Sequence, residues 1–192
     1  MGGVLAGIRV VELGQVLAGP FVGAIFADLG AEVIKVERAE GGDDARRMGP
    51  DFRHGDALTF HIMNRGKRSV ALDMRAPSGR AAFEHLAATA DVLVHNLRPD
   101  VPAALGIDGA AMTARHPRLI YAAISAFGHV GPLALHPGFE PLIQAYSGLS
   151  SLNGGEGDPP LRAAASLCDQ GSAMWAVIGA LAMLHQRGRT GQ

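Results

Sequence analysis

Residues 8–37 have the sequence IRVVELGQVLAGPFVGAIFADLGAEVIKVE, in which two short apolar runs flank a segment of helical character. The first run, Ile8 to Leu13, is typical of a buried parallel strand. Pro20 falls where the first turn of a helix tolerates proline, and Phe21 to Leu29 continues that helix. Val33 to Glu37 predicts the next strand. The stretch therefore predicts a βαβ unit of about 30 residues, the opening of a doubly wound α/β domain.

The same alternation of strands and helices continues along the chain. Further strands are predicted at Ser69 to Asp73, Val92 to His95 and Leu119 to Ser125, and helices from Ala76-Pro77-Ser78 to about Thr89 and from Asp169 to about Gln186. This order predicts an α/β fold with a Rossmann-like, mostly parallel sheet and helices on both faces. Residues 41–66 are polar, Arg-rich and without clear period, which indicates a long surface loop of functional importance.

Composition excludes several classes of protein. The 192 residues include 17 Lys+Arg against 18 Asp+Glu, a net charge of −1, which argues against a nucleic-acid partner. A hydrophobic content of 48% excludes disorder. The longest apolar run, Ala173 to Leu184, is shorter than the ~20 residues of a membrane span, and no targeting segment is recognisable. With Cys168 as the single cysteine, we expect a one-domain cytoplasmic protein with no membrane partner.

The turn after the first predicted strand does not carry a dinucleotide fingerprint. Residues 14–20 are GQVLAGP rather than G-x-G-x-x-G, and Pro20 removes one of the N–H donors that a phosphate site at a helix N-terminus would use. Glu37 ends the second strand, where a dinucleotide fold places its ribose-binding acid, but without the glycines that signal is weak. Nicotinamide binding is therefore not expected.

Asp169 is the candidate catalytic residue, and its position allows two interpretations. It follows the apolar stretch LRAAASLC and begins a predicted helix, so it is a candidate N-cap worth about 1 kcal/mol. A carboxylate at a helix N-terminus is also held ionised and oriented, which would suit a nucleophile towards an activated acyl group. The eight histidines form no H-E-x-x-H motif and no Cys/His cluster, so no metal site is predicted.

Several motifs occur in a fixed order along the chain, and together they indicate a protein family more specifically than any single motif would. They are LAGIRVVELGQVLAGPFVGAIFADLGAEVIKVERAEGGDDAR, NRGKRSVALDM, DVLVHNLRPDVPAALGID, LIYAAISAFGHVGPLALHPGFEPLIQAYSGL and DQGSAMWAVIGALAMLHQRGRTGQ. This series resembles the family III CoA-transferases of the CaiB/BaiF type. The resemblance runs from about Leu5 to Gln192.

The resemblance implies a domain organisation. Family members have a Rossmann-like large domain and a smaller domain, and two subunits interlock into a homodimer like links of a chain. They are about twice as long as this chain. The resemblance therefore implies that residues 1–192 are the N-terminal part of a truncated large domain. The small domain, the C-terminal return segment and the glycine-rich loop that closes the active site would be absent, so the resemblance implies no independent activity for this fragment alone.

The resemblance also implies an activity, the transfer of CoA from an acyl-CoA donor to a small carboxylic acid. Asp169 matches the catalytic aspartate, whose carboxylate forms an anhydride with the donor acyl group and then an aspartyl-CoA thioester. Such nucleophilic catalysis needs an ionised carboxylate and N–H donors near the oxyanion, and an N-cap position is expected to supply both. Coenzyme A is a substrate, and no tightly bound cofactor is implied.

The CoA-contacting positions carried over from the family come from several turns of the predicted fold. They are Gln15, Val16, Leu17, Ala18, Arg38, Leu72, Arg75, Asn96, Leu97 and Arg98. Arg38 and Arg75 suit the CoA phosphates, because guanidinium groups bind phosphate in bidentate fashion. The chain departs from the pattern at Ala104, where some relatives carry an arginine for which Arg98 would compensate.

Two alternative functions remain open. The family includes α-methylacyl-CoA racemases, whose catalytic histidine lies in a G-H-D-like motif. Here that motif is Gly138-Phe139-Glu140, and Phe139 cannot exchange a proton, which favours the transferase. Phe139 and Glu140 are expected near the substrate, although a helix-start carboxylate would also explain Glu140. The other alternative is a non-catalytic CoA-binding or dimerising fragment.

Overall fold

A five-stranded parallel sheet forms the framework of the protein, whose computed structural model describes residues 2–191. The strands are β1 (Arg9–Glu12), β2 (Glu32–Arg38), β5 (Arg68–Leu72), β6 (Val92–His95) and β7 (Ile120–Ala123). Their order in the sheet is β5-β2-β1-β6-β7. The chain thus builds outward from β1 to β5 and then crosses back to β6, so that the order reverses between β1 and β6. The predicted parallel α/β sheet is confirmed.

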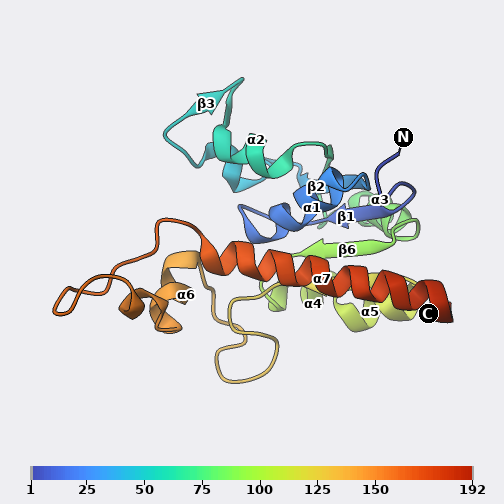
Figure 1. Cartoon of the computed structure of the whole chain (residues 1–192). Coiled ribbons are helices and arrows are strands. Elements are labelled where there is room, and N and C mark those ends of the chain that lie inside the picture. Colours follow the sequence, from blue (N-terminus) through green and yellow to red (C-terminus); the bar gives the residue numbers. More distant parts are fainter. Residues whose placement is uncertain (1, 192) are drawn as a thin grey trace.

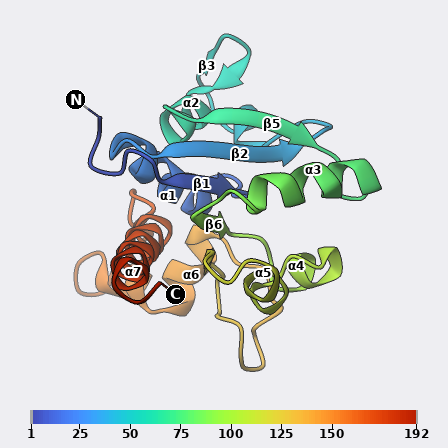
Figure 2. The same ribbon diagram turned by 90° about the vertical axis from the view of Figure 1, so that its right-hand side faces the viewer.

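Helices cover both faces of this sheet (Figures 1 and 2). One face carries α1 (Ala18–Asp28) and α7 (Leu167–Thr190), and the other carries α3 (Pro77–Ala87), α4 (Asp100–Leu105) and α5 (Gly109–Arg115). The short α6 (Glu140–Tyr146) and a 3₁₀ turn, η2 (Leu149–Leu152), precede α7. The strands are buried on both faces, which explains their continuous apolar runs.

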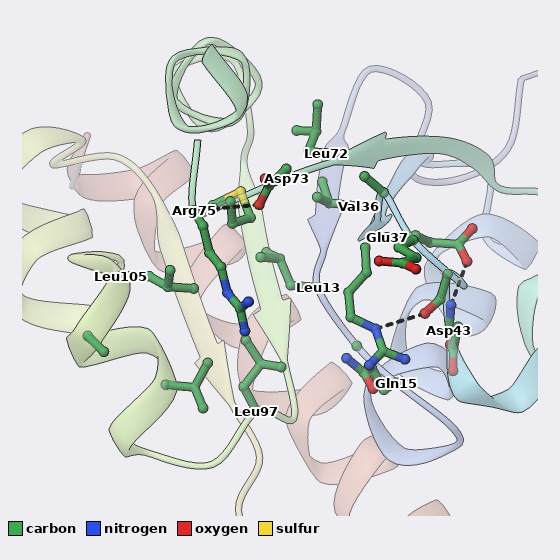
Figure 3. A pocket seen from close by; sticks show the side chains of 18 of the residues that line it. Leu13, Gln15, Val36, Glu37, Asp43, Leu72, Asp73, Arg75, Leu97 and Leu105 are labelled. Carbon is green, nitrogen blue, oxygen red and sulfur yellow. Dashed lines mark hydrogen bonds between the residues drawn. The ribbon is translucent and has the colours of Figure 1, made fainter. Parts of the chain in front are cut away.

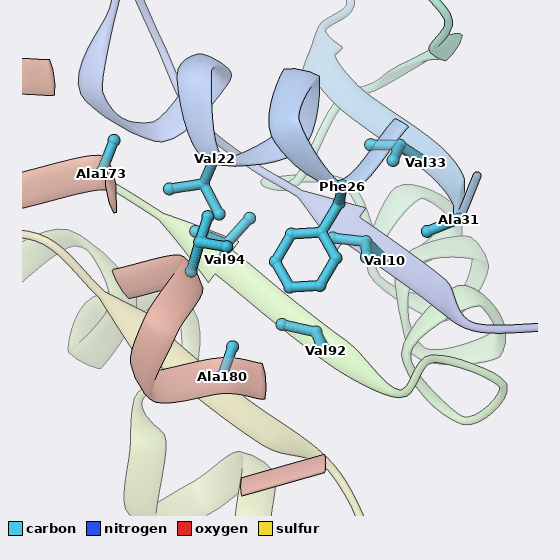
Figure 4. Close-up of a cluster of buried hydrophobic side chains, with 10 residues drawn as sticks. Val10, Val22, Phe26, Ala31, Val33, Val92, Val94, Ala173 and Ala180 are labelled. Atoms are coloured by element: carbon cyan, nitrogen blue, oxygen red, sulfur yellow. The ribbon is translucent and has the colours of Figure 1, made fainter. Parts of the chain in front are cut away.

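Two apolar clusters hold the layers together. In the first, Phe26 of α1 is fully buried against Val10 and Val92 of the sheet (Figure 4). Ala173 and Ala180 of α7 close this cluster, and their small side chains let α7 approach the sheet and α1. The second cluster, on the opposite face, includes Phe83 of α3, Leu93 of β6 and Met112 of α5.

The boundaries of the first βαβ unit differ slightly from those predicted. The helix α1 begins at Ala18 rather than Phe21, so Pro20 lies inside its first turn, where no N–H donor is needed. The N–H of Phe21 donates to the Leu17 carbonyl at 2.7 Å and closes that turn. At the other end, Gly30 adopts a φ of 93°, a left-handed conformation that ends the helix at little cost.

The prediction of a plain surface loop at residues 41–66 is wrong. The segment contains η1 (Asp44–Arg47), a small hairpin of β3 (Phe52–Arg53) and β4 (Asp56–Ala57), and α2 (Leu58–Asn64). Its order comes from polar contacts distant in sequence. Arg46 donates to Glu37 and Asp56 at 2.7 Å each, and its guanidinium lies 3.8 Å from the ring centroid of Phe60. No periodic apolar pattern in the sequence predicts such an arrangement.

The last helix also departs from expectation at both ends. It begins at Leu167, two residues before Asp169, and continues through Gly188 to Thr190. Its N-cap is Ser166, so the interpretation of Asp169 as N-cap is wrong. By length and composition, α7 is the one described helix that could cross a membrane, with a mean hydropathy of 1.3. A single such helix is weak evidence, because core helices pass the same test.

Candidate functional site

The carboxyl ends of the parallel strands surround a cavity of about 820 Å³ (Figure 3). It lies where the strand order reverses between β1 and β6, the place where open α/β sheets bind their ligands. The residues that follow four strands contribute to its wall. Of the positions predicted to contact CoA, those that line it are Gln15, Arg38, Leu72, Arg75 and Leu97.

The predicted phosphate-binding arginines differ in how much of their hydrogen-bonding capacity is free. Arg38 already donates to the Gly42 carbonyl at 3.0 Å and to Asp44 at 2.6 Å. Arg98 pairs with Asp100 at 2.6 Å and does not line the cavity. The Arg75 side chain extends towards Leu97 (Figure 3), and its guanidinium has no hydrogen-bond partner among residues 2–191. Arg75 is therefore the arginine best placed to receive an anion in the cavity.

The carboxylate of Glu37, near the end of β2, is hydrogen-bonded to other groups of the protein. Its two oxygens accept hydrogen bonds from Arg46, from the Ser69 hydroxyl at 2.5 Å and from the backbone N–H of Asp43 at 2.9 Å. Burial opposes ionisation, but these donors outweigh it and lower the pKa of Glu37 to about 2. A carboxylate bonded in this way has little capacity left for ribose hydroxyls.

Asp169 lies in a smaller pocket of about 90 Å³, beside the larger cavity. Four other predicted residues, Ala18, Asn96, Phe139 and Glu140, line the same pocket. Ala18 belongs to the turn that starts with Gln15, and Asn96 precedes Leu97, so one turn and one strand end separate the two spaces. Val16, Leu17 and Arg98 line neither space.

Glu140, rather than Asp169, caps the N-terminus of α7. Its Oε1 accepts from the Cys168 N–H at 3.0 Å and from the Gln144 amide at 2.6 Å, and its Oε2 accepts from the Asp169 N–H at 2.6 Å. Burial disfavours the charge, but these donors lower the pKa of Glu140 below its usual range. The first-turn donors of α7 are thus occupied. The expectation that this helix end offers N–H donors to an oxyanion is wrong.

The ionisation of Asp169 also differs from expectation. Burial, and then repulsion from the Glu140 carboxylate, raise the pKa of Asp169 to about 6. The helix N-terminus does not lower the pKa of this carboxyl group, because a second buried carboxylate already receives its N–H groups. A carboxyl group with a pKa near 6 is still ionised at pH 7, and its basicity increases its nucleophilicity.

Replacing Glu140 by glutamine is expected to lower the pKa of Asp169 towards its ordinary value of 3.8, because the repelling charge disappears. In the wild type, folded Asp169 binds its proton more tightly than the unfolded chain. The contribution of Asp169 to the free energy of unfolding therefore falls as pH rises from 3.8 to about 6. In E140Q this fall is expected to be smaller. Carboxyl NMR titration measures the shift, with E156Q on an exposed loop as control. An unchanged Asp169 titration in E140Q would contradict the electrostatic coupling.

Sequence reasoning missed several residues of the two spaces. Ser172 lies one turn after Asp169 on α7 and lines the same pocket; the i, i+3 spacing on a helix is the signal that could have found it. Asp43 lines the cavity but sits in the segment expected to be a loop. Asp73 follows the end of β5 and Val101 lies in α4, and neither carried a distinguishing pattern. Among residues 2–191, no three His, Cys, Asp or Glu side chains are grouped to hold a metal ion.

Comparisons with known proteins give matches in both sequence and structure. Residues 5–192 match the model of the family described as CoA-transferase family III. The succinate–glutarate CoA-transferase of Agrobacterium fabrum is 40% identical over 98% of the chain, which covers 48% of that relative. The acetyl-CoA:oxalate CoA-transferase of Acetobacter aceti is also 40% identical, over 97% of the chain and 48% of its own length.

A solved structure shares the whole fold. The crystal structure of a CAIB/BAIF family protein from Brucella suis superposes with a TM-score of 0.95 at 39% identity, covering 100% of this chain and 52% of that one. The chain thus spans about half the length of the relatives it matches.

Proposed function

The chain belongs to CoA-transferase family III, and on that basis we propose that it carries the CoA-binding and nucleophilic part of an acyl-CoA:carboxylate CoA-transferase. Residues 1–192 would form the N-terminal part of the family's large domain, with the small domain and return segment supplied elsewhere in a longer polypeptide. The observation that carries the proposal is the placement of Asp169, partly buried in a small pocket that adjoins the larger cavity across one turn.

The larger cavity is the proposed binding site of coenzyme A. Its position at the switch point suits a nucleotide, and its apolar wall from Leu13, Leu72 and Leu97 suits a flat base or a pantetheine chain. Arg75 supplies a free guanidinium for phosphate, and Arg38 a partly engaged one. The thioester end of the ligand would pass the Gln15–Ala18 turn to reach Asp169.

The chemistry proposed for Asp169 is a double exchange. Its carboxylate oxygen attacks the carbonyl carbon of the donor thioester and expels CoA thiolate, which leaves a mixed anhydride. The thiolate then attacks the aspartyl carbon, releases the donor acid and forms an aspartyl-CoA thioester. The acceptor carboxylate attacks that carbon and expels the thiolate again. Finally the thiolate attacks the acceptor carbonyl of the new anhydride, which yields the product thioester and regenerates Asp169.

The developing oxyanion needs N–H donors that α7 cannot give, because Glu140 accepts its first-turn donors. Ala18, the first residue of α1, lines the Asp169 pocket. The free N–H groups at that helix start are therefore the proposed donors. With the pKa of Asp169 at about 6, the transferase is expected to lose activity below that pH as the nucleophile is protonated.

Small carboxylic acids are the proposed donors and acceptors. The named relatives act on succinate, glutarate and oxalate, and a pocket of about 90 Å³ beside Asp169 favours acids of that size. A racemase of this family would be expected to use a histidine to exchange the α-proton. The lining residues of the pocket described here include no histidine, and Phe139 stands at the position concerned. Acyl transfer therefore has the better support.

The exposed side of α7 is the proposed contact with the rest of the longer polypeptide or with the partner of an interlocked homodimer. Trp175 is 73% exposed, and Met174 and Ile178 beside it are 53% exposed each. Apolar side chains grouped in this way on one helix normally pack against protein.

Trapping with hydroxylamine tests the proposed function. The full-length polypeptide that contains this chain is incubated with a panel of acyl-CoAs and hydroxylamine, then digested for mass spectrometry. We expect a hydroxamate on Asp169 with the accepted donor and none in D169A. An unmodified Asp169 across the panel, together with exchange of the α-proton into deuterated solvent, would instead support a racemase.

Replacing Arg75 by alanine is expected to weaken CoA binding by roughly 10-fold, because a charge-assisted phosphate contact is lost. Since Arg75 lies away from Asp169, the rate of Asp169 labelling at saturating acyl-CoA should stay within about 2-fold of wild type. Isothermal titration with CoA measures the affinity. R118A is the matched control, because Arg118 lies at the end of the sheet opposite to the cavity. Equal affinities for R75A and wild type would remove Arg75 from the site.

A further inference from the structure

The turn between the two spaces is strained at one residue. Val16 has a φ of 64°, in the left-handed region that β-branched residues rarely adopt. Such a conformation persists only where surrounding contacts hold it. Gln15, immediately before it, lines the larger cavity, and Ala18, two residues after it, lines the Asp169 pocket. The conformation of Val16 therefore sets the relative position of two wall residues of the proposed site.

Two polar side chains hold this turn from opposite sides. Asn96, after β6, donates to the Gln15 carbonyl and accepts from the Gln15 N–H, both at 2.8 Å. Asp43, after β2, accepts the N–H of Val16 at 2.9 Å through its Oδ1. Asn96 was expected to contact CoA, whereas Asp43 was not singled out by any motif. Asp43 makes the contact to the strained residue itself.

Asp43 is fixed far more firmly than a loop residue. It is 2% exposed, and its backbone N–H donates to Glu37 Oε2 at 2.9 Å. Its Oδ2 lies 2.8 Å from the buried ammonium of Lys35. Lys35 in turn donates to Glu12 Oε1 and to the Gly14 carbonyl, each at 2.8 Å. The carboxylate is thus held from the strand β2 and from the start of the turn itself.

We infer that Asp43 is a positioning residue, which holds Val16 in its left-handed conformation and so aligns the Gln15–Ala18 turn between the CoA cavity and Asp169. This inference rests on the proposed function for its substrate. It assigns Asp43 no contact with the reacting atoms. The same side chain caps η1 through the Ala45 N–H at 2.9 Å, so the segment that follows Arg38 and the turn that carries Gln15 share one anchor.

Paired substitutions of Asp43 test the inference. Asp43→Ala removes the acceptor of the Val16 N–H, whereas Asp43→Asn keeps an oxygen for that N–H and replaces the charged oxygen that faces Lys35 by an amide NH2 group, which ends the ion pair. At saturating acyl-CoA, we expect D43A to lower the rate of Asp169 hydroxamate formation by roughly 10- to 100-fold, and D43N to retain most of it. Asp108→Ala, which removes a comparable cap from α5, is the matched control and should label as wild type does.

A double-mutant cycle separates positioning from loss of stability. Glycine adopts a positive φ without strain, so Val16→Gly should make the turn less dependent on Asp43. We expect the D43A loss in labelling rate to shrink by about 5-fold or more when combined with V16G. A role limited to folding would give the same D43A loss in labelling rate in both backgrounds. The melting temperatures of D43A and D43N would then follow the same order as their labelling rates. Hydrogen exchange of the peptide around residue 16 should rise in D43A and stay low in D43N.

The outcomes distinguish this inference from the proposed function. If wild type is not labelled by any acyl-CoA, the proposed function fails and hydrogen exchange alone decides the positioning role. If wild type is labelled and D43A is labelled equally fast, the inference is wrong while the transferase stands. Equal losses in D43A and D43N would also overturn it, because they would assign the effect to the buried charge rather than to the bond with Val16.

Discussion

Asp169→Ala is expected to lower CoA transfer by roughly 10⁴-fold or more, because the other carboxylate that lines the small pocket, Glu140, already accepts the N–H groups of Cys168 and Asp169. Binding of CoA should stay within about 3-fold of wild type, since Asp169 does not line the larger cavity. Asp169→Asn should lose transfer to the same extent, because its amide is not nucleophilic. Steady-state transfer in the full-length polypeptide and CoA titration measure the two quantities separately.

The matched control for this prediction is Asp158→Ala. Asp158 caps an exposed turn through the Gly155 N–H at 2.7 Å, and it lies in neither space of the site. Its loss should leave transfer unchanged. Transfer by D169A within 10-fold of wild type would mean that Asp169 is a structural carboxyl group and that another residue receives the acyl group.

Glu12→Ala is the substitution expected to destabilise the fold most. Glu12 is fully buried and lies between the only two lysines of the chain, 2.8 Å from Lys35 Nζ and 2.6 Å from Lys67 Nζ. Removing it leaves two buried ammonium groups without their shared partner, which costs about 3–5 kcal/mol. Denaturant unfolding of the wild type and E12A measures the difference in the free energy of unfolding.

The pH dependence of the difference in unfolding free energy between the wild type and E12A identifies the cause of that difference. Burial lowers the pKa of Lys67 to about 8 from 10.5, although Glu12 partly opposes the shift. Without Glu12 the pKa of Lys67 falls further, so at pH 7 Lys67 is less charged in folded E12A than in the folded wild type. At pH 9 it is mostly neutral in both folded proteins. The part of the deficit due to Lys67 therefore shrinks between pH 7 and pH 9.

Glu32→Ala provides the comparison. Glu32 pairs with Arg9 and Arg68, but its side chain is 35% exposed, and such pairs contribute about 0–1 kcal/mol. The account of Glu12 as partner of two buried charges would be contradicted if E12A lost as little free energy of unfolding as E32A. It would also be contradicted if the loss in E12A did not change between pH 7 and pH 9.

Much of the architecture follows from local patterns. The five strands and the helices α1, α3 and α7 lie close to their predicted places, because buried parallel strands require continuous apolar runs and their helices begin and end at residues such as Pro20 and Gly30. The family resemblance then identified Asp169 and the candidate CoA contacts.

Other features had no local signal. The order of residues 41–66 depends on Arg46 meeting Glu37 and Asp56, which lie on different elements. Asp43 acquires its role only when the loop after β2 folds against the turn after β1, bringing its carboxylate to a residue 27 positions away. Neither hydrophobic period nor turn chemistry encodes a contact between side chains so distant in sequence.

The amino-acid sequence by itself determined the α/β layers, because they depend on periodicity, and its resemblance to a known family gave the candidate nucleophile. Only the tertiary structure decided the electrostatics of that nucleophile. Burial raises the pKa of the Asp169 carboxyl group, and Glu140, which lies 29 positions earlier in the sequence and accepts the Asp169 N–H, raises it further. Burial and the approach of a second charge exist only once the chain has folded, and they change which groups at the start of α7 are free to react.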